Sequence, residues 1–339
     1  VYFDGLNRFY VSKDRQELKD AFHSGPNVFD GFALSGTSSA SFCGKLTQEL
    51  NRQREESRRL TQTLEQREMK HPHFISHPCR AEEFDEIWFD RYCQELRESK
   101  RYHRKLWEFC AICHILDQSG KLSRGNSGLG FGVGKEPLGA YFAKRGCTVL
   151  ATDLDPGRAK IAGWVETNQH SSNLLDLNER KICEEAEFSE RVRFMAVDMN
   201  DIPPSLYGAF DFTWSSCSLE HCGSISLGAS FIINQLKCLK PGGLAVHTTE
   251  FNVSSNTSTI EEGGTVIFRQ KDIERIKQLV TAQGYEIVVD YSVGDTETDN
   301  YVDLPPYTSD THLKLRLMEY VSTSIILIIQ KPNEWQPSS

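Results

Sequence analysis

The chain has 339 residues, of which 39% are hydrophobic and 25% are charged, a composition typical of a globular protein with one large domain and an appendage, or with two domains. The formal net charge of −9 argues against a nucleic-acid partner, because proteins that bind phosphate backbones usually carry a basic surface. The most apolar run, residues 325–329, is far shorter than the roughly 20 residues that a membrane span needs, so we predict no membrane span.

The chain contains ten cysteines, which are scattered without the spacing of a small disulfide-bonded domain. We therefore expect free thiols and a location in the reducing cytoplasm. Because the chain does not begin with methionine, we interpret it as part of a longer protein.

Residues 1–80 are predicted to form an N-terminal extension that contains a long helix. Residues 45–70 contain no Gly or Pro, and four leucines among them follow a heptad-like spacing of four and three residues: Leu46, Leu50, Leu60 and Leu64. Polar residues interrupt this series. The pattern fits a short coiled coil, and it fits equally well a solvated helix that lies on the domain.

Residues 81–124 are predicted to form two helices that lead into the main domain, because large apolar residues recur at helical spacing. Cys110, Cys113 and His114 match the spacing of a haem attachment motif. They fall inside the second amphipathic helix, which favours packing in the core. Zinc would need two further ligands at a regular spacing, and the sequence offers no second such pair.

From residue 125 to residue 331 the pattern changes to alternating strands and helices, and residues 332–339 form a tail. Such alternation is typical of a doubly wound, mostly parallel α/β sheet. We predict seven strands: one that ends in the glycines at 128–134, and others at 147–153, 192–198, 209–215, 243–249, 285–290 and 323–330. Helices are predicted between them, at 137–144, 157–168, 226–239 and 270–283.

The first of these strands ends in a loop with alternating glycines, of which the last three are Gly130, Gly132 and Gly134. Glycine lets the backbone approach a ligand closely, and the helix that follows offers unpaired N–H groups. The second strand ends at Asp153, where a carboxylate suits the hydroxyls of a ribose. Strand, glycine loop, helix, strand and acid together predict half of a nucleotide-cofactor site.

A nicotinamide-binding domain is the nearest alternative for this loop. Its fingerprint requires a third glycine at a fixed offset from the opening Gly-x-Gly pair. That position holds Lys135 when the pair begins at Gly130, and Pro137 when it begins at Gly132. Neither residue satisfies the fingerprint.

Three downstream motifs complete a pattern that resembles class I S-adenosylmethionine-dependent methyltransferases: Val197-Asp198-Met199, then residues 210–215 followed by Leu219-Glu220-His221, and then Leu239-Lys240-Pro241-Gly242-Gly243. The resemblance covers residues 125–331 and implies a Rossmann-like methyltransferase fold with S-adenosylmethionine as the cofactor. The cofactor-binding residues that it implies are Gly130, Gly132, Gly134, Asp153, Leu154, Asp198, Met199 and Ser215.

One position departs from the family pattern. Relatives usually carry an acidic residue two positions before the first glycine of the motif, where it binds the amino group of the cofactor, whereas this chain has Gly128. Glu136, just beyond the loop, could supply that carboxylate. Alternatively, Glu136 is an acid favoured by the helix dipole in the first turn of a helix.

Methyl transfer to a hydroxyl requires an aligned nucleophile and removal of its proton. His221 follows the fourth strand at the carboxyl edge of the sheet and is our candidate general base, with Glu220 beside it. The alternative is that these two residues only orient the loop. Candidate substrate-binding residues are Glu250 and three residues of the polar insertion at 292–315, namely Tyr301, Asp303 and His312. We predict no metal.

Residues 265–273 and 301–316 are similar to segments of methyltransferase domains found beside glycosyltransferases in bacterial surface-polysaccharide assembly. This resemblance implies O-methylation of a sugar or glycan hydroxyl. It also suggests that the N-terminal helix joins the chain to a second copy or to a larger assembly protein. Two other functions stay open: a small-molecule O- or N-methyltransferase of secondary metabolism, and a non-catalytic adaptor with the cofactor fold.

Overall fold

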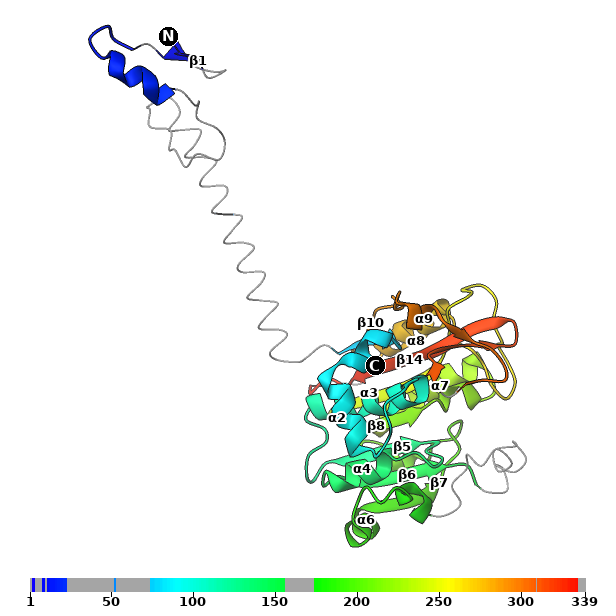
Figure 1. Ribbon diagram of the computed structural model, residues 1–339. Coiled ribbons are helices and arrows are strands. Elements are labelled where there is room, and N and C mark those ends of the chain that lie inside the picture. The colour runs from blue at the N-terminus through cyan, green and yellow to red at the C-terminus, as the bar shows by residue number, and fades with distance from the viewer. Residues whose placement is uncertain are drawn as a thin grey trace. The chain divides into compact units, whose positions relative to one another are not determined.

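The computed structural model describes residues 2–3, 8–9, 11–22, 52, 74–155, 174–308 and 310–334. The chain divides into two compact units, Val1–His71 and Pro72–Ser339. In the first unit a short hairpin of β1 (Tyr2–Phe3) and β2 (Arg8–Phe9) is followed by the 3-10 helix η1 (Gln16–Phe22) (Figure 1). The predicted helix at 45–70 and its coiled coil lie outside the described residues, except for residue 52, which is helical.

The second unit is built on a ten-stranded, mostly parallel sheet, so the predicted fold class is confirmed. Eight strands follow the order β10-β3-β14-β9-β8-β5-β6-β7, and β13 and β11 continue from β14. Their bounds are β3 (Ile75–Pro78), β5 (Ser127–Phe131), β6 (Thr148–Asp153), β7 (Val192–Ala196), β8 (Phe210–Ser216), β9 (Leu239–Asn252), β10 (Val288–Val289), β11 (Val302–Asp303), β13 (Lys314–Leu317) and β14 (Tyr320–Gln330). A separate parallel pair joins β4 (Tyr102–His103) to β12 (Thr311–His312).

Helices cover both faces of this sheet (Figure 1). The α-helices of the described part are α2 (Ile87–Glu95), α3 (Arg104–Gln118), α4 (Leu138–Lys144), α6 (Glu185–Arg191), α7 (Ile225–Gln235), α8 (Gln270–Ala282) and α9 (Glu297–Asn300). The helix predicted at 157–168 lies outside the described residues. No helix in the described part is long and apolar enough to cross a bilayer.

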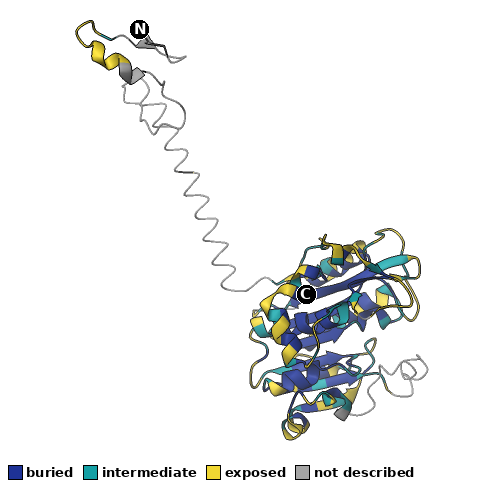
Figure 2. Ribbon diagram, in the orientation of Figure 1, coloured by how far each residue is buried: buried dark blue, intermediate teal, exposed yellow. Residues whose placement is uncertain are grey.

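Two hydrophobic cores form, one on each face of the sheet, and β14 contributes to both. Ile326 and Ile328 pack with residues of α2, α3 and α4, whereas Ile325, Leu327 and Ile329 pack with residues of α7 and α8. Successive side chains of a strand point to opposite faces, so a strand that is covered on both sides must be apolar throughout. Figure 2 shows these strands as buried, between helices whose outer faces are exposed.

The sheet has more strands than the seven that we predicted, mainly because β3 inserts between β14 and β10. The strand pairs antiparallel with β14 and parallel with β10. Ser76 holds it in place: its hydroxyl accepts the Ile328 N–H at 2.9 Å, and its carbonyl accepts the Asp290 N–H at 2.8 Å. The sequence Ile-Ser-His-Pro has neither an apolar run nor alternation, so we had placed it in the N-terminal extension.

Nine cysteines of the described part are free thiols, as predicted, and Cys43 lies outside it. Cys110 and Cys113 are fully buried in α3, where they pack with the core. The structure therefore favours the packing interpretation of this pair over a haem or zinc site.

Candidate functional site

The glycine loop between β5 and α4 closes against the end of β6. Gly132 and Gly134 have φ angles of +56° and +49°, a region that other residues adopt only with strain. The Gly134 N–H donates to Asp153 Oδ2 at 3.0 Å, and the Leu154 N–H donates to Asp153 Oδ1 at 2.8 Å. The predicted carboxylate therefore lies at the loop, as the sequence indicated.

Gly128 and Gly130 are glycine because aromatic rings of β8 press against them. A Cβ atom at Gly128 would lie 2.3 Å from the Phe212 ring, and one at Gly130 would lie 2.4 Å from the Trp214 ring. No real Cβ atom tolerates such distances, so the family's acidic residue cannot occupy position 128 in this packing.

Gly128→Asp is expected to destabilise the protein by more than about 3 kcal/mol, since it overpacks the core and buries a carboxylate beside Phe212. Gly139→Ala in α4 is the matched control, because its added Cβ would meet Val149 at an ordinary 3.8 Å. Urea unfolding would compare the two variants. A Gly128→Asp protein as stable as Gly139→Ala would contradict the packing argument.

Glu136, the alternative carboxylate, lies just before α4 and is buried. Its Oε1 accepts the indole N–H of Trp214 at 2.5 Å. Burial raises the pKa of Glu136 to about 8, although the Trp214 hydrogen bond and Lys105 lower it. At neutral pH this carboxyl therefore carries a proton in the protein alone.

Residues that follow β7 and β8 form the next part of the site. A Cβ atom at Gly132 would lie 2.7 Å from Ser218 Oγ and 3.5 Å from Met199 Sδ, so both side chains border the loop. The Ser218 hydroxyl donates to the Gly132 carbonyl at 2.9 Å. Asp198 accepts the N–H of Asn200 at 2.9 Å, which fixes the turn that presents Met199. Met199, predicted to bind the cofactor, thus borders the loop, Asp198 lies just before it, and Ser218 beside the loop was not predicted.

Ser215, predicted to bind the cofactor, is fully buried and faces α7 instead. Its hydroxyl is 2.8 Å from Nδ1 of His247 on β9, and burial lowers the pKa of His247 to about 3. Alternation along β8 sends Ser215 to this face and Ser216 to the other. Ser218, two residues beyond the end of β8, is the serine that lies against the glycine loop.

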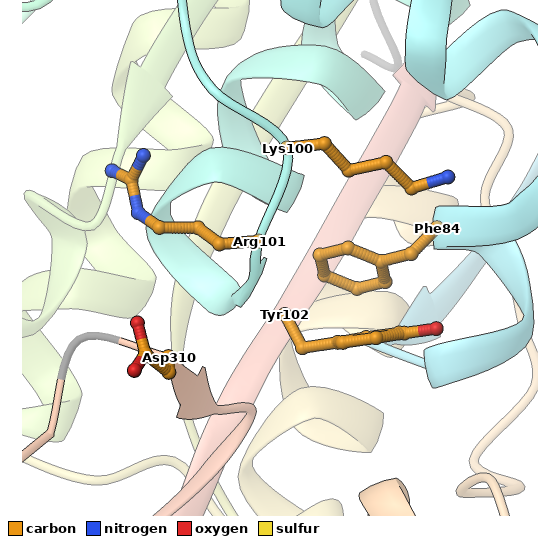
Figure 3. A pocket seen from close by; sticks show the side chains of 5 residues that line it. All are labelled: Phe84, Lys100, Arg101, Tyr102 and Asp310. Atoms are coloured by element: carbon orange, nitrogen blue, oxygen red, sulfur yellow. The ribbon is translucent and has the colours of Figure 1, made fainter.

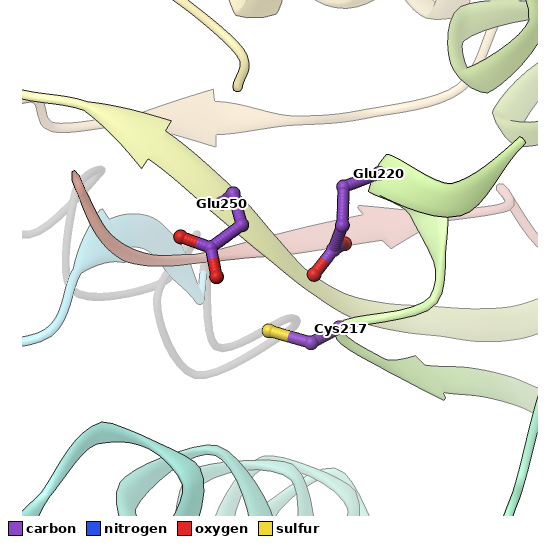
Figure 4. A group of neighbouring side chains, drawn as sticks. All are labelled: Cys217, Glu220 and Glu250. Carbon is purple, nitrogen blue, oxygen red and sulfur yellow. The ribbon is translucent and has the colours of Figure 1, made fainter. Parts of the chain in front are cut away.

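Three reactive side chains converge where β8 and β9 approach their carboxyl ends. Figure 4 shows the Cys217 thiol and the Glu220 and Glu250 carboxylates pointing toward one another, and their potential ligand atoms all lie within 4.8 Å. Cys217, with a φ of +48°, directly follows β8, and the 3-10 turn η5 (Leu219–His221) begins two residues later. The turn is anchored because the Cys217 N–H donates to the Thr248 carbonyl at 3.1 Å.

All three side chains already have protein partners. The Cys217 thiol donates to Glu108 at 3.0 Å, and Glu220 accepts the Thr249 hydroxyl at 2.9 Å. Glu250 forms an ion pair with Arg104 and accepts the Ser322 hydroxyl. These bonds do not favour a cation at this place, and the absence of a metal stays a prediction.

Removal of divalent cations is expected to leave turnover unchanged, because the nearest candidate ligands are satisfied by protein donors. The measurement is the steady-state rate after dialysis against EDTA, with and without added Mg²⁺. A loss of rate that Mg²⁺ restores would overturn this prediction.

The start of α3 supplies charged residues that sequence reasoning missed. Glu108 is fully buried and accepts five hydrogen bonds: from Lys105 Nζ (2.9 Å), Ser216 Oγ (2.9 Å), Cys217 Sγ (3.0 Å), Thr248 Oγ1 (3.3 Å) and Ser324 Oγ (2.5 Å). Burial acts to raise the pKa of Glu108, but Lys105 and Arg104 hold it at about 2. The sequence does carry one signal for this cluster: Glu108 is a charged residue among the apolar core residues of the predicted helix.

His221 lies at the end of η5, and its ring contacts the loop that follows β9. Its Nδ1 is 2.7 Å from the Gly264 carbonyl, which can only accept, so the ring proton is on Nδ1. This tautomer makes Nε2 the basic nitrogen. The neighbouring Glu220 is buried, which raises the pKa of its carboxyl, and the proximity of His221 lowers it.

The three substrate-binding residues predicted in the insertion differ in their burial and in their contacts. Asp303 and His312 are buried and bond to each other, with 2.6 Å between Oδ2 and Nδ1. The His312 ring also stacks on His103, whose own Nδ1 caps α3. These two residues therefore brace the start of α3, and their role in substrate binding stays a prediction. Tyr301 is 45% exposed.

Comparisons with known proteins agree with this arrangement. Residues 129–247 match the family described as a methyltransferase domain. No curated protein sequence matches the chain significantly.

Three similar solved structures are methyltransferases by their descriptions. The magnesium protoporphyrin IX methyltransferase of Synechocystis, solved with bound SAH, is 14% identical, with 73% of this chain and 96% of that chain covered and a TM-score of 0.40. A TehB-like SAM-dependent methyltransferase from Corynebacterium glutamicum is 16% identical, with 72% and 97% covered and a TM-score of 0.35. The glycopeptide N-methyltransferase MtfA is 11% identical, with 66% and 95% covered and a TM-score of 0.39.

Since these TM-scores are all below 0.5, the fold is assigned from the sheet order and the activity from the family match. Gly132 and Gly134, with their positive φ angles, leave the loop backbone without side chains at these positions, and this backbone and the Asp153 carboxylate beside it fit a nucleoside cofactor. The chain carries a class I S-adenosylmethionine-dependent methyltransferase domain, with S-adenosylmethionine as its cofactor.

Proposed function

We propose that this enzyme methylates a hydroxyl group of a sugar or glycan. The observation that carries the proposal is the polar wall at the carboxyl ends of β8 and β9. It consists of Glu220, Glu250 and Arg104, with the hydroxyls of Thr249 and Ser322 bonded to the carboxylates. Pockets for small aromatic ligands are mostly apolar, whereas a polyhydroxylated ligand needs fixed donors and acceptors. This wall suits the second kind of ligand.

The chain's own residues would hold the two reactants as follows. Gly132, Gly134 and Asp153 bind the nucleoside part of the cofactor, and Met199 and Ser218 border it. When bound, the sulfonium supplies an activated methyl group. The polar wall would bind the acceptor and orient its hydroxyl toward the activated methyl group.

Deprotonation of the acceptor falls to His221 in this proposal. Nε2 takes the hydroxyl proton while Nδ1–H stays bonded to the Gly264 carbonyl. Glu220 lies next to His221 and its carboxylate stabilises the resulting imidazolium.

Glu136 is proposed to bind the amino group of the cofactor, in place of the missing acid at position 128. An ammonium group would bind the ionised carboxylate, whereas the pKa of about 8 means that Glu136 is protonated beforehand. Cofactor binding at pH 7 is therefore expected to release a large fraction of one proton, and affinity should rise between about pH 6 and pH 8.

Calorimetry of cofactor binding in buffers of different ionisation enthalpy measures this proton release. Glu136→Gln should abolish it and weaken binding. Glu83→Gln is the matched control, because Glu83 also accepts an indole N–H, from Trp107 at 2.9 Å, and burial raises its pKa to about 7. Equal proton release in the Glu136→Gln protein would remove Glu136 from the cofactor site.

The proposed function is tested by incubating the enzyme with methyl-labelled cofactor and three sets of acceptors: sugar nucleotides, oligosaccharides and small phenols or amines. Label in a sugar hydroxyl is the expected result. Label only in phenols or amines would overturn the proposal in favour of a small-molecule methyltransferase.

A further inference from the structure

A pocket of about 400 Å³ lies between the 3-10 helix η2 (Ala81–Asp85), the residues that lead into β4, and the residue just before β12. Its lining residues are Phe84, Lys100, Arg101, Tyr102 and Asp310 (Figure 3). None of them belongs to the cofactor loop or to the polar wall. The volume is within the range of small-ligand sites.

Aromatic rings form one side of this pocket. The Tyr102 ring packs on the buried Phe84 ring, with 5.1 Å between centroids and 40° between planes. The Tyr102 hydroxyl donates to Asp85 at 3.3 Å, which fixes the other end of the side chain. A ring held in this way is a rigid surface, and its electron-rich face attracts the C–H groups of a sugar ring.

The charged residues of the pocket are balanced by nearby acids. Lys100 Nζ pairs with Asp90 at 3.0 Å and lies 3.8 Å from Asp85, and Arg101 pairs with Glu98 at 3.0 Å. Asp310 adds a further carboxylate to the lining. The pocket therefore offers donors and acceptors side by side without an excess of positive charge. This balance disfavours a phosphate and favours a neutral polyhydroxylated ligand.

The pocket is joined to the methyl-transfer site by a short stretch of chain. Tyr102 pairs with Thr311 in the β4–β12 ladder, next to Asp310. Arg104, which pairs with Glu250, follows Tyr102 by two residues, and two residues span about 7 Å at most. The backbone of Tyr102 therefore lies within about 7 Å of that of Arg104, whose side chain reaches Glu250 of the polar wall.

We propose that this pocket binds a neutral sugar residue of an extended acceptor, next to the residue that is methylated. The acceptor is then an oligosaccharide or polysaccharide chain. This inference rests on the proposed sugar O-methylation for its link to catalysis, but sugar binding to the pocket can be measured alone.

The first experiment titrates the full chain, without methyl transfer, with neutral gluco- and manno-oligosaccharides of one to four residues and with oligogalacturonides of the same lengths. Saturation-transfer NMR reports binding. We expect the neutral chains of two or more residues to bind, and Arg101→Gln and Tyr102→Leu to weaken that binding. Arg193→Gln, an exposed site on β7, is the matched control. Absence of binding, or binding of the anionic chains only, would overturn the inference.

The second experiment measures kcat/KM for a single sugar and for a chain that carries the same acceptor unit. We expect kcat/KM to be about tenfold higher for the chain than for the single sugar. Arg101→Gln or Tyr102→Leu should bring this ratio close to one. An equal kcat/KM for both acceptors in the unaltered enzyme would overturn the inference. If sugars bind but none is methylated, the proposed function fails while the pocket assignment stands.

Discussion

Glu108→Gln is expected to lower the free energy of unfolding by about 3 kcal/mol or more and to remove most of the methyl transfer. Glu108 is a fully buried acceptor for five donors, among them the Lys105 ammonium and the Cys217 thiol. An amide would turn N–H groups toward some of these donors and would leave the two nearby cations without a buried counter-charge. Breaking a buried pair in this way costs about 3–5 kcal/mol.

The loss should depend on pH in a defined direction. The pKa of Glu108 is about 2 in the folded protein, below its ordinary value of 4.5, so the folded state binds this proton less readily than the unfolded state. The corresponding stabilisation, about 3 kcal/mol, is complete above about pH 4.5 and disappears as the pH falls toward 2. The difference between the unaltered enzyme and Glu108→Gln should therefore shrink in acid.

Urea unfolding at pH 7 and at pH 3.5, followed by tryptophan fluorescence, measures this dependence. Glu187→Gln is the matched control, since Glu187 forms a partly exposed pair with Arg191 on one helix, α6. Such surface pairs contribute under about 1 kcal/mol. A Glu108→Gln effect as small as that of Glu187→Gln, or one that is equal at both pH values, would contradict the argument.

The turnover of Glu108→Gln is expected to fall because Glu108 positions the segment that leads to Glu220 and His221, the proposed catalytic residues. The thiol and the hydroxyl that it holds belong to Cys217 and Ser216, directly before η5. Glu108→Asp keeps the charge on a shorter side chain and should recover part of the stability. Comparing Glu108→Gln with Glu108→Asp therefore distinguishes the effect of the carboxylate's charge from the effect of the side chain's length.

Local patterns were enough to predict that the glycine loop and Asp153 lie together. The strands that carry them are buried and regular, and the glycine loop and Asp153 lie close together in the sequence. Their contact, the Gly134 N–H to Asp153, joins residues 19 positions apart. Parallel strands place such residues at one edge of a sheet, so the geometry follows from the order of the elements.

The acceptor half could not be predicted in the same way, because it is built from distant parts of the chain. Glu108 bonds Ser324, 216 positions away, and Arg104 pairs with Glu250 from another element. Neither a hydrophobic periodicity nor a sequence motif predicts a contact between residues that lie so far apart in the chain. The prediction for Ser215 missed a local feature: β8 runs to Ser216, one residue beyond the predicted end, and alternation along the strand points the Ser215 side chain to the face covered by α7.

His221→Ala is expected to reduce turnover by about 10²–10⁴-fold while cofactor affinity stays nearly unchanged. Asp153→Ala should do the reverse and weaken cofactor binding first, since its carboxylate lies at the glycine loop. Steady-state rates and calorimetry with S-adenosylmethionine measure the two effects. An unchanged turnover in His221→Ala would exclude His221 as the base.

A fall in turnover alone would also occur if Glu220 and His221 only orient the loop, and His221→Asn separates the two roles. The asparagine amide can replace Nδ1–H as the donor to the Gly264 carbonyl, but it has no basic nitrogen. If His221 is the base, His221→Asn should be as inactive as His221→Ala, and added imidazole should restore part of the rate to the alanine variant. If the residue only holds the loop, His221→Asn should retain most of the activity and imidazole should have no effect. Because one hydrogen bond fixes the tautomer and the loop together, only a variant that keeps this bond can show which role carries the reaction.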